Sequence, residues 1–142
     1  MLDSCLKKQE TIIELFSRCC SKEEVYEKII ELGKNAPPLD PKDKIPENLV
    51  FGCQSTVYLQ SHWKGDVIIF QAESDALISS GLASLLTFVY SGESPKTILT
   101  CPPKYLDELD IPASLTPSRA NGLSSIHLRM KQDALHLLMV TR

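Results

Sequence analysis

The chain has 142 residues and a formal net charge of −3 at pH 7, with 43% hydrophobic and 23% charged residues. These values are typical of a globular protein, and we expect one domain over residues 1–142. The small negative charge argues against a nucleic-acid-binding protein, because such proteins usually carry a basic patch. The most apolar stretch, residues 81–90, has about half of the length that a membrane-spanning helix needs. Because the N-terminus also lacks a signal-peptide pattern, we expect a cytoplasmic protein that does not contact a membrane.

The first segment is predicted to form a helix, because apolar residues recur there at helical spacing. On this pattern Cys20 belongs to the buried face, whereas Cys5 lies near a helix end and is assigned no role. The expected buried stripe consists of Leu2, Leu6, Ile13, Phe16 and Cys20.

A second helix is predicted to begin at Ser21. Ser21 and Glu24 have the spacing of a capping box, in which each side chain binds a free backbone N–H of the first turn. Gly33 stands where a left-handed residue often ends a helix, and it is expected to be the C-cap. Residues 34–48 contain four prolines, and this predicts an ordered or extended loop.

The middle of the chain favours a β-hairpin followed by a central helix. Residues 56–63 and 67–72 are rich in β-branched and aromatic residues, with a turn expected at Lys64-Gly65. Ser74 or Asp75 is the predicted cap of a broad apolar helix that ends before Gly92.

Residues 94–116 contain four further prolines and are predicted to form short helical turns. Pro117 is placed to open the last helix. Helices at both ends of a small hairpin predict an α+β fold, in which a small antiparallel β-sheet has helices packed on one face.

The five cysteines are predicted not to form a disulfide framework. Their number is odd, and a cytoplasmic compartment is reducing. There is no C-x-x-C motif, and no histidine is spaced with a cysteine as in a zinc site, so we expect no metal site. Cys101 precedes two prolines and can be accessible, but no pattern assigns it a role. The cysteines are Cys5, Cys19, Cys20, Cys53 and Cys101.

Cys53 is the most informative of these thiols. Gly52 precedes it, which permits unusual backbone geometry or the close approach of a partner. Gln54 and Ser55 follow it and are both polar, which is a poor setting for a core cysteine. The thiol is therefore a candidate for contact with another protein. The alternative, a small and partly buried apolar residue, is equally compatible with the spacing.

Arg119 is the second unusual residue. It falls in the first turn of the predicted last helix, where a positive charge opposes the helix dipole. An anionic partner group can explain it, although a solvated surface arginine is the simpler interpretation. The sequence contains no Ser–His–Asp set, phosphate-binding loop or dinucleotide fingerprint.

Gly52-Cys53-Gln54-Ser55, followed by Val57-Tyr58, is the first of several blocks of the sequence that together resemble the SufE family of sulfur acceptors. Tyr58 stands where many members of the family have tryptophan. The other blocks lie in family order along nearly the whole chain. They are Ile30-Glu31-Leu32-Gly33, Glu73-Ser74-Asp75-Ala76-Leu77-Ile78 with Gly81-Leu82, and Leu115-Thr116-Pro117-Ser118-Arg119 with Asn121-Gly122-Leu123.

The resemblance implies a SufE/NifU-like fold and a role in iron–sulfur cluster assembly. Cys53 would be the nucleophile that takes persulfide sulfur from a SufS-type cysteine desulfurase, with Gly52, Gln54, Ser55 and Arg119 around it. Such a protein stimulates the desulfurase and passes sulfur on to a downstream iron–sulfur scaffold. It has no cofactor of its own, since the pyridoxal phosphate belongs to the desulfurase, and it is not itself an enzyme.

Three other functions stay open at this point. A U-type iron–sulfur cluster scaffold shares a related fold but usually needs several thiolate ligands. A desulfurase-binding module could function without Cys53. A cysteine-dependent hydrolase would need a base beside the thiol, and no histidine motif supplies one.

Overall fold

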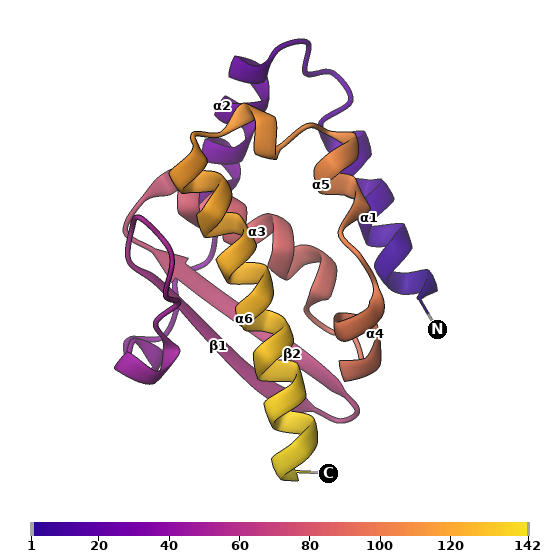
Figure 1. The fold of residues 1–142 in the computed structure, drawn as a ribbon, viewed down its shortest axis with the longest axis vertical. Coiled ribbons are helices and arrows are strands. Elements are labelled where there is room, and N and C mark those ends of the chain that lie inside the picture. Colours follow the sequence, from indigo (N-terminus) through magenta and orange to yellow (C-terminus); the bar gives the residue numbers. More distant parts are fainter. Residues whose placement is uncertain (1, 142) are drawn as a thin grey trace.

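A two-stranded antiparallel sheet lies at the centre of the computed structural model, which describes residues 2–141 (Figure 1). Helices from both ends of the chain surround this hairpin. The helices and strands are α1 (Asp3–Leu15), α2 (Lys22–Lys34), β1 (Val57–Lys64), β2 (Val67–Ser74), α3 (Leu77–Tyr90), α4 (Pro95–Thr100), α5 (Lys104–Glu108) and α6 (Pro117–Thr141).

The hairpin forms where its alternating sequence predicts it. The strands pair from Val57↔Ser74 to Lys64↔Val67, which leaves Gly65 and Asp66 as a two-residue turn. Gly65 has a φ of 62°, the left-handed value that the first residue of one common hairpin turn requires. The turn thus lies one residue later than predicted, because Lys64 is still paired within the ladder.

One face of the hairpin is covered by helices, as predicted. Phe70 points from β2 into the core and lines the same hollow as Leu85 of α3. Ser61 of β1 donates a hydrogen bond to the Asp133 carboxylate of α6 at 2.7 Å. The buried residues of this face are Val57, Leu59, Ile68 and Phe70.

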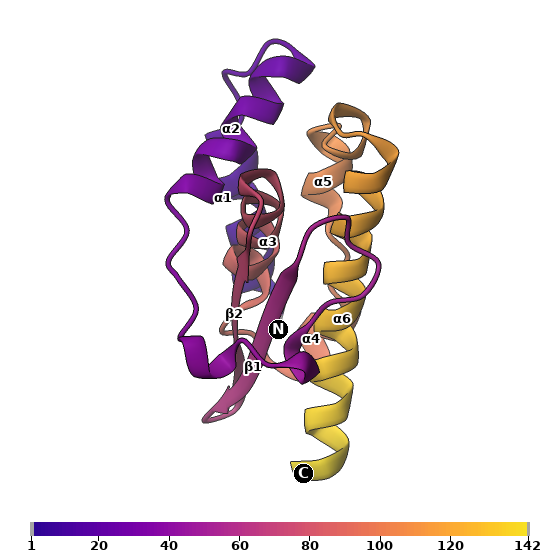
Figure 2. The ribbon, with the colours of Figure 1, turned by 90° about the vertical axis from the view of Figure 1, so that its left-hand side faces the viewer.

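The proline-rich segment 36–48 covers part of the opposite face. Figure 2 shows it descending from α2 beside β2 before the chain turns toward α6. Glu73 holds it in place, because its carboxylate accepts from the Leu39 backbone N–H at 2.7 Å and pairs with the Lys44 ammonium at 2.5 Å. The segment contains only two short 3₁₀ turns, Pro41–Asp43 and Pro46–Asn48.

The start of α2 confirms one half of the predicted capping box, but its end differs from the prediction. The Ser21 hydroxyl accepts from the Glu24 N–H at 3.2 Å, as predicted. The Glu24 carboxylate reaches back one residue further than expected and accepts from the Cys20 N–H at 3.1 Å. Gly33, predicted to be a left-handed C-cap, lies inside α2 with its Cα against the backbone of Leu77. Asn35 is the C-cap instead.

Gly33 and Gly81 allow α2 and α3 to cross at close range. A β-carbon on Gly33 would collide with the backbone of α3, and one on Gly81 would collide with the backbone of Ile29. Neither predicted cap of α3 is confirmed: Ala76 is the N-cap, while the Ser74 hydroxyl accepts from the Ala76 N–H at 3.2 Å.

The buried face of α1 agrees only in part with the predicted stripe. Phe16 is buried, and Leu2 and Ile13 pack half-buried against the core, as predicted. Leu6 is 42% exposed, however, and the buried residues within the helix are Cys5, Gln9 and Ile12. The apolar pattern misleads here because a polar residue, Gln9, occupies a buried position and satisfies its amide with hydrogen bonds.

Cys20, predicted to pack in this stripe, is exposed, because α1 ends at Leu15 and the chain turns before reaching it. Cys5 and Cys101 are both buried, although the sequence indicates a helix end for the first and an accessible position for the second.

The remaining helices follow the prediction more closely. Residues 94–116 form the short helices α4 and α5 and a 3₁₀ turn, as predicted, and α6 begins at Pro117. No helix within residues 2–141 combines the length and the apolar character needed to cross a membrane. The inner face of α6 buries Leu123, Ile126, Met130 and Ala134.

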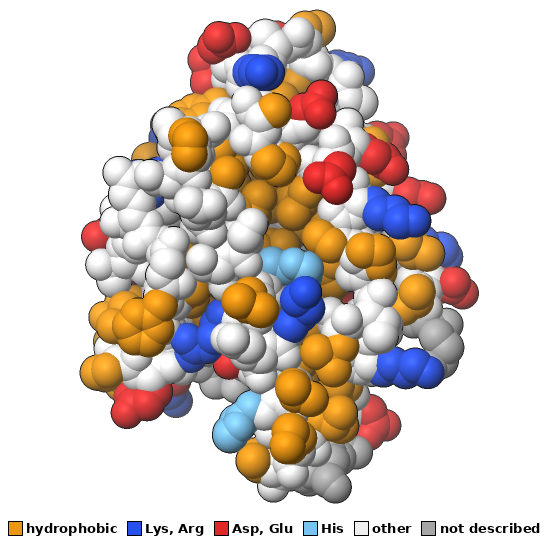
Figure 3. Space-filling model, in the orientation of Figure 1, with side chains coloured by type: hydrophobic (Ala, Val, Ile, Leu, Met, Phe, Trp, Pro, Cys, Tyr) orange, Lys and Arg blue, Asp and Glu red, His pale blue; other side chains and the backbone are white. Residues whose placement is uncertain are grey.

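The outer face of α6 carries exposed apolar side chains toward its C-terminal end. In Figure 3 they gather over the lower part of the molecule, below the pale blue side chain of a histidine. The residues are Leu128, Leu135, Leu138 and Met139, with exposed fractions of 53%, 47%, 39% and 74%.

Candidate functional site

Cys53 lies in a short loop that is fastened at its C-terminal end and rests against α6. The Val50 N–H donates to the Val57 carbonyl at 2.9 Å, which closes the loop at its base. The Thr56 N–H donates to the Asp75 carboxylate at 3.1 Å, just before α3. Figures 1 and 2 both show this loop running beside the N-terminal half of α6 before the chain enters β1.

The first turns of α6 present one face to this loop. Arg119, Gly122 and Ser125 are three residues apart, so they lie on the same side of the helix. The Cys53 thiol donates to the Gly122 carbonyl, with 3.7 Å between sulfur and oxygen. Gly122 is buried, and a β-carbon there would lie 3.8 Å from the sulfur, in ordinary contact. The thiol is thus packed directly on the backbone of α6.

Gly52 has two reasons to be glycine. Its φ is 92°, a value that side chains disfavour. A β-carbon at this position would also collide with the Ser125 hydroxyl oxygen of α6, which would have to rotate away. The residue before Cys53 therefore lets the loop turn sharply while it touches the helix.

Arg119 joins the cysteine loop to α3. Its Nη1 donates to the Ser55 hydroxyl at 3.1 Å and to the Ser79 hydroxyl at 3.0 Å. The two hydroxyl oxygens are themselves 2.5 Å apart. Ser74 extends the cluster, since its hydroxyl donates to Ser55 at 3.4 Å. The guanidinium is therefore held in a fixed position beside the loop, unlike a freely solvated surface arginine.

Sequence reasoning did not nominate Ser79. It is 5% exposed on α3, a helix whose other buried positions are mostly apolar. A buried hydroxyl on such a helix needs a hydrogen-bond partner. The pair Ser79-Ser80 within an apolar run was therefore the signal that could have drawn attention to it.

Two opposing effects set the acidity of the Cys53 thiol. Burial raises the pKa of Cys53 above its ordinary value, because the thiolate is poorly solvated against α6. The positive charge of Arg119 acts in the opposite direction and lowers this pKa. The net effect is a raised pKa, so the observed conformation favours the protonated thiol over the reactive thiolate.

The structure brings together most of the residues predicted for the site. Gly52, Cys53, Ser55 and Arg119 form one cluster between the loop, α3 and α6. Gln54 lies in the same loop and is exposed. Among the described residues there is no group of three or more His, Cys, Asp or Glu side chains that could hold a metal ion.

This arrangement defines a small α+β protein that presents one half-buried thiol in a glycine-containing loop. The family model for SufE, described as an Fe-S metabolism associated domain, matches residues 10–134. The chain therefore belongs to the SufE family, and this membership connects it with iron–sulfur metabolism.

Two relatives support the assignment. The chain is 36% identical over 131 residues to SufE-like protein 1, chloroplastic/mitochondrial, of Arabidopsis thaliana. This match covers 92% of the chain but only 35% of the Arabidopsis protein. The chain is also 34% identical over 124 residues to an uncharacterized SufE-like protein of Synechocystis. This second match covers 87% of the chain and 78% of the Synechocystis protein.

A solved structure shows the same fold. The solution structure of a hypothetical protein from Thermus thermophilus superposes with a TM-score of 0.74 at 25% sequence identity. The match covers 93% of this chain and 96% of the Thermus chain. The predicted fold, a small antiparallel sheet with helices packed on one face, is thus confirmed.

Proposed function

We propose that this chain is a sulfur acceptor that receives persulfide sulfur from a SufS-type cysteine desulfurase onto Cys53. The observation that carries the proposal is the placement of the Cys53 thiol, half-buried on α6, in a loop that Arg119 joins to α3. It is further supported by membership of a family associated with iron–sulfur metabolism.

The transfer is a persulfide form of thiol–disulfide exchange. The Cys53 thiolate attacks the outer sulfur of the desulfurase persulfide and forms a new S–S bond. The original S–S bond breaks, and the desulfurase cysteine leaves as a thiolate. Cys53 then carries one additional sulfur atom, and its own proton has passed to solvent or to the leaving thiolate.

A sulfur carrier must shelter its sulfur while it is free and expose it to its partner, and the surroundings of Cys53 suit both requirements. Contact with α6 shelters the sulfur and keeps the thiol protonated while the protein is free. Movement of the loop away from α6 would return water to the sulfur, remove the cause of the raised pKa and let the thiolate form. Arg119 stands beside the loop to stabilise the negative charge that then develops.

In this proposal the chain stimulates the desulfurase and passes the sulfur to a downstream iron–sulfur scaffold. It uses no cofactor of its own and is not an enzyme by itself. The cytoplasmic location stays a prediction, and the Arabidopsis relative is named as a chloroplastic/mitochondrial protein.

The decisive experiment measures the mass of the intact protein after incubation with a cysteine desulfurase, pyridoxal phosphate and cysteine. We expect wild type to gain the mass of one sulfur atom, with the gain removed by a reductant and absent from Cys53→Ala. Cys20→Ala is the matched control, because Cys20 is an exposed thiol outside the site. A gain that persists in Cys53→Ala would refute the assignment of Cys53 as the carrier.

A further inference from the structure

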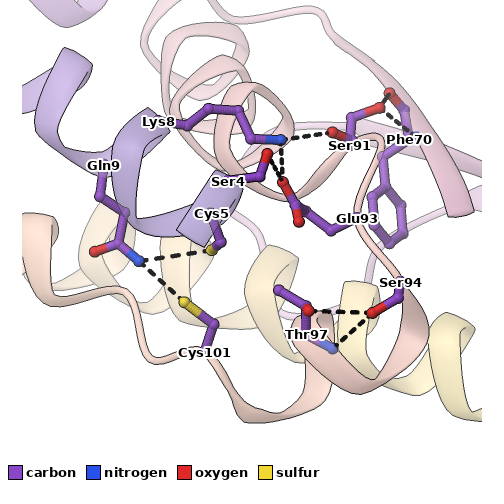
Figure 4. Close-up of polar contacts among 10 residues, drawn as sticks. All are labelled: Ser4, Cys5, Lys8, Gln9, Phe70, Ser91, Glu93, Ser94, Thr97 and Cys101. Atoms are coloured by element: carbon purple, nitrogen blue, oxygen red, sulfur yellow. Dashed lines mark hydrogen bonds and ion pairs between the residues drawn. The ribbon is translucent and has the colours of Figure 1, made fainter. Parts of the chain in front are cut away.

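Two buried thiols meet where α1 contacts the segment that follows α4. Cys5 of α1 has no exposed surface, and Cys101, the C-cap of α4, is 2% exposed. Figure 4 shows both sulfur atoms directed toward the side-chain amide of Gln9. The amide nitrogen lies 3.8 Å from the Cys5 sulfur and 3.4 Å from the Cys101 sulfur. The fold thus brings two cysteines from distant parts of the chain to one amide group.

The two thiols also interact with each other. Burial is the main reason that the pKa of Cys5 rises to about 12, and a hydrogen bond with Cys101 raises it further. Gln9 also binds the backbone at this junction. The same amide nitrogen donates to the Pro102 carbonyl at 3.0 Å, and the side-chain carbonyl oxygen accepts from the Tyr105 N–H at 3.3 Å.

A second set of contacts fixes the position of α1 beside this pair. The carboxylate of Glu93, which is 4% exposed, accepts from the Ser4 hydroxyl at 2.9 Å and pairs with the Lys8 ammonium at 2.5 Å. Lys8 also donates to the Ser91 carbonyl at 3.0 Å. Ser4 and Lys8 lie one turn apart on α1, before and after Cys5 in the chain, so their contacts hold α1 in the position that places Cys5 beside Cys101.

We propose that Cys5 and Cys101 form an intramolecular disulfide when the protein meets a small disulfide oxidant such as oxidised glutathione, and that this bond fastens α1 to the body of the protein. The proposal goes beyond sulfur acceptance at Cys53. It assigns a redox modification to a pair of cysteines that the proposed function does not use.

The reaction has two exchange steps. The Cys5 thiolate attacks oxidised glutathione, breaks its S–S bond and releases one glutathione thiolate. The Cys101 thiolate then attacks the Cys5 sulfur of this mixed disulfide and releases the second glutathione. The two protein thiols are oxidised to one disulfide, one molecule of oxidised glutathione is reduced to two thiols, and the two protons of the protein thiols end on them.

Access to the pair requires the first turns of α1 to open. Cys5 lies in the first turn of α1, and the terminal turns of a helix open at a lower free-energy cost than the packed core. The groups that such an opening uncovers around Ser4 and Lys8 are polar or charged and can bind water. As α1 closes again, the modified Cys5 approaches the Cys101 thiol, and the exchange releases glutathione before the helix is fully docked.

The pair is separate from the candidate sulfur-acceptor site. Cys53 rests on Gly122 of α6. In Figure 1 the loop before β1 lies on the left of the molecule, whereas α1 and α4 lie on the right. The proposed disulfide therefore leaves the Cys53 thiol in place.

The test oxidises the full chain with oxidised glutathione, alkylates the remaining thiols in denaturant and maps the peptides by mass spectrometry. We expect a linked peptide that contains Cys5 and Cys101, two hydrogen atoms lighter than the reduced pair. The bond closes a loop of about 100 residues, and it should raise Tm by roughly 10 °C until dithiothreitol reverses it.

Matched variants separate this product from other oxidations. Cys5→Ser and Cys101→Ser should each lose the linked peptide and the rise in Tm, whereas Cys20→Ser should keep both. The proposal is overturned if Cys5 and Cys101 are both fully alkylated after oxidation, or if either is linked to a different cysteine. A correct link without any rise in Tm would overturn the fastening of α1.

Discussion

Arg119 connects three parts of the site through one guanidinium. It reaches Ser55 in the cysteine loop and Ser79 on α3, and its charge lowers the pKa of Cys53. A positive charge in the first turn of α6 is unfavourable for the helix by a few tenths of a kcal/mol up to about 1 kcal/mol. Its contacts with the loop explain its position better than solvation does.

Arg119→Ala should make Cys53 less reactive. Loss of the positive charge raises the pKa of Cys53 further, so less thiolate is present at a given pH. We expect alkylation of the Cys53 peptide by iodoacetamide at neutral pH to slow severalfold, and the pH profile of the rate to move to higher pH.

Arg119→Lys is the matched control for this prediction. Lysine keeps the positive charge but replaces the guanidinium, whose Nη1 donates to both serines, so the pH profile of Arg119→Lys should stay nearer that of wild type. Identical pH profiles for wild type and Arg119→Ala would contradict an electrostatic role for Arg119.

At the level of the elements, the crossing of α2 and α3 determines where the site can form. Gly33 and Gly81 let the two helix backbones approach closely, and α3 in turn carries Ser79 toward Arg119. The cysteine loop is tied to the start of the same helix through Thr56 and Asp75. A shift of α3 would therefore displace several contacts of the loop at once.

Gly81→Ala should destabilise the fold strongly. The new β-carbon would meet the backbone of Ile29, which cannot rotate away as a side chain could. We expect the free energy of unfolding to fall by about 3 kcal/mol, measured by urea denaturation. Lys34→Ala, on the exposed end of α2, should change it by less than about 0.5 kcal/mol. Equal stability of Gly81→Ala and wild type would show that the helices can separate at little cost.

For the whole molecule, His127 links the packing of α6 on α3 to pH. Its ring stacks on Tyr90 with the ring centres 5.2 Å apart, and its Nε2 is buried without a hydrogen-bond partner among the described residues. Burial lowers the pKa of His127 to about 4, and the charge of Lys131 contributes in the same direction. The folded protein therefore holds this imidazole neutral at pH values where the unfolded chain would protonate it.

The protein should lose stability as the pH falls from about 6.5 toward 4. In this window the unfolded state binds a proton that the folded state does not, so protonation favours unfolding. Between pH 6.5 and 4.5 we expect a loss of about 2 kcal/mol in the free energy of unfolding, measured by urea denaturation.

Two variants test the assignment of this loss to His127. His127→Gln should flatten the pH dependence in this window, whereas His136→Gln, an exposed position on the same helix, should retain it. The salt-bridged Glu73 adds a further loss only below about pH 4.5, because its pKa is lowered from the ordinary value of 4.5. An unchanged slope in His127→Gln would contradict this explanation.

Local sequence determined the features that depend on neighbouring residues. The capping box at Ser21, the hairpin and the start of α6 at Pro117 follow from capping chemistry, alternation and a fixed φ, which act within a few residues. The cysteine motif likewise lies in one continuous stretch, so the sequence alone is enough to single out Cys53.

Tertiary structure decided which surfaces meet. The sequence predicts that Gly33 ends a helix, but in the structure its missing side chain lets the backbone of α3 pack directly against α2. The buried face of α1 contains Gln9 because residues 102–105 supply partners for its amide. Ser79 and Arg119, and likewise Cys5 and Cys101, come together only in the folded chain. These contacts join residues 40 or more positions apart, and no local pattern encodes them, because they depend on how the helices pack around the hairpin.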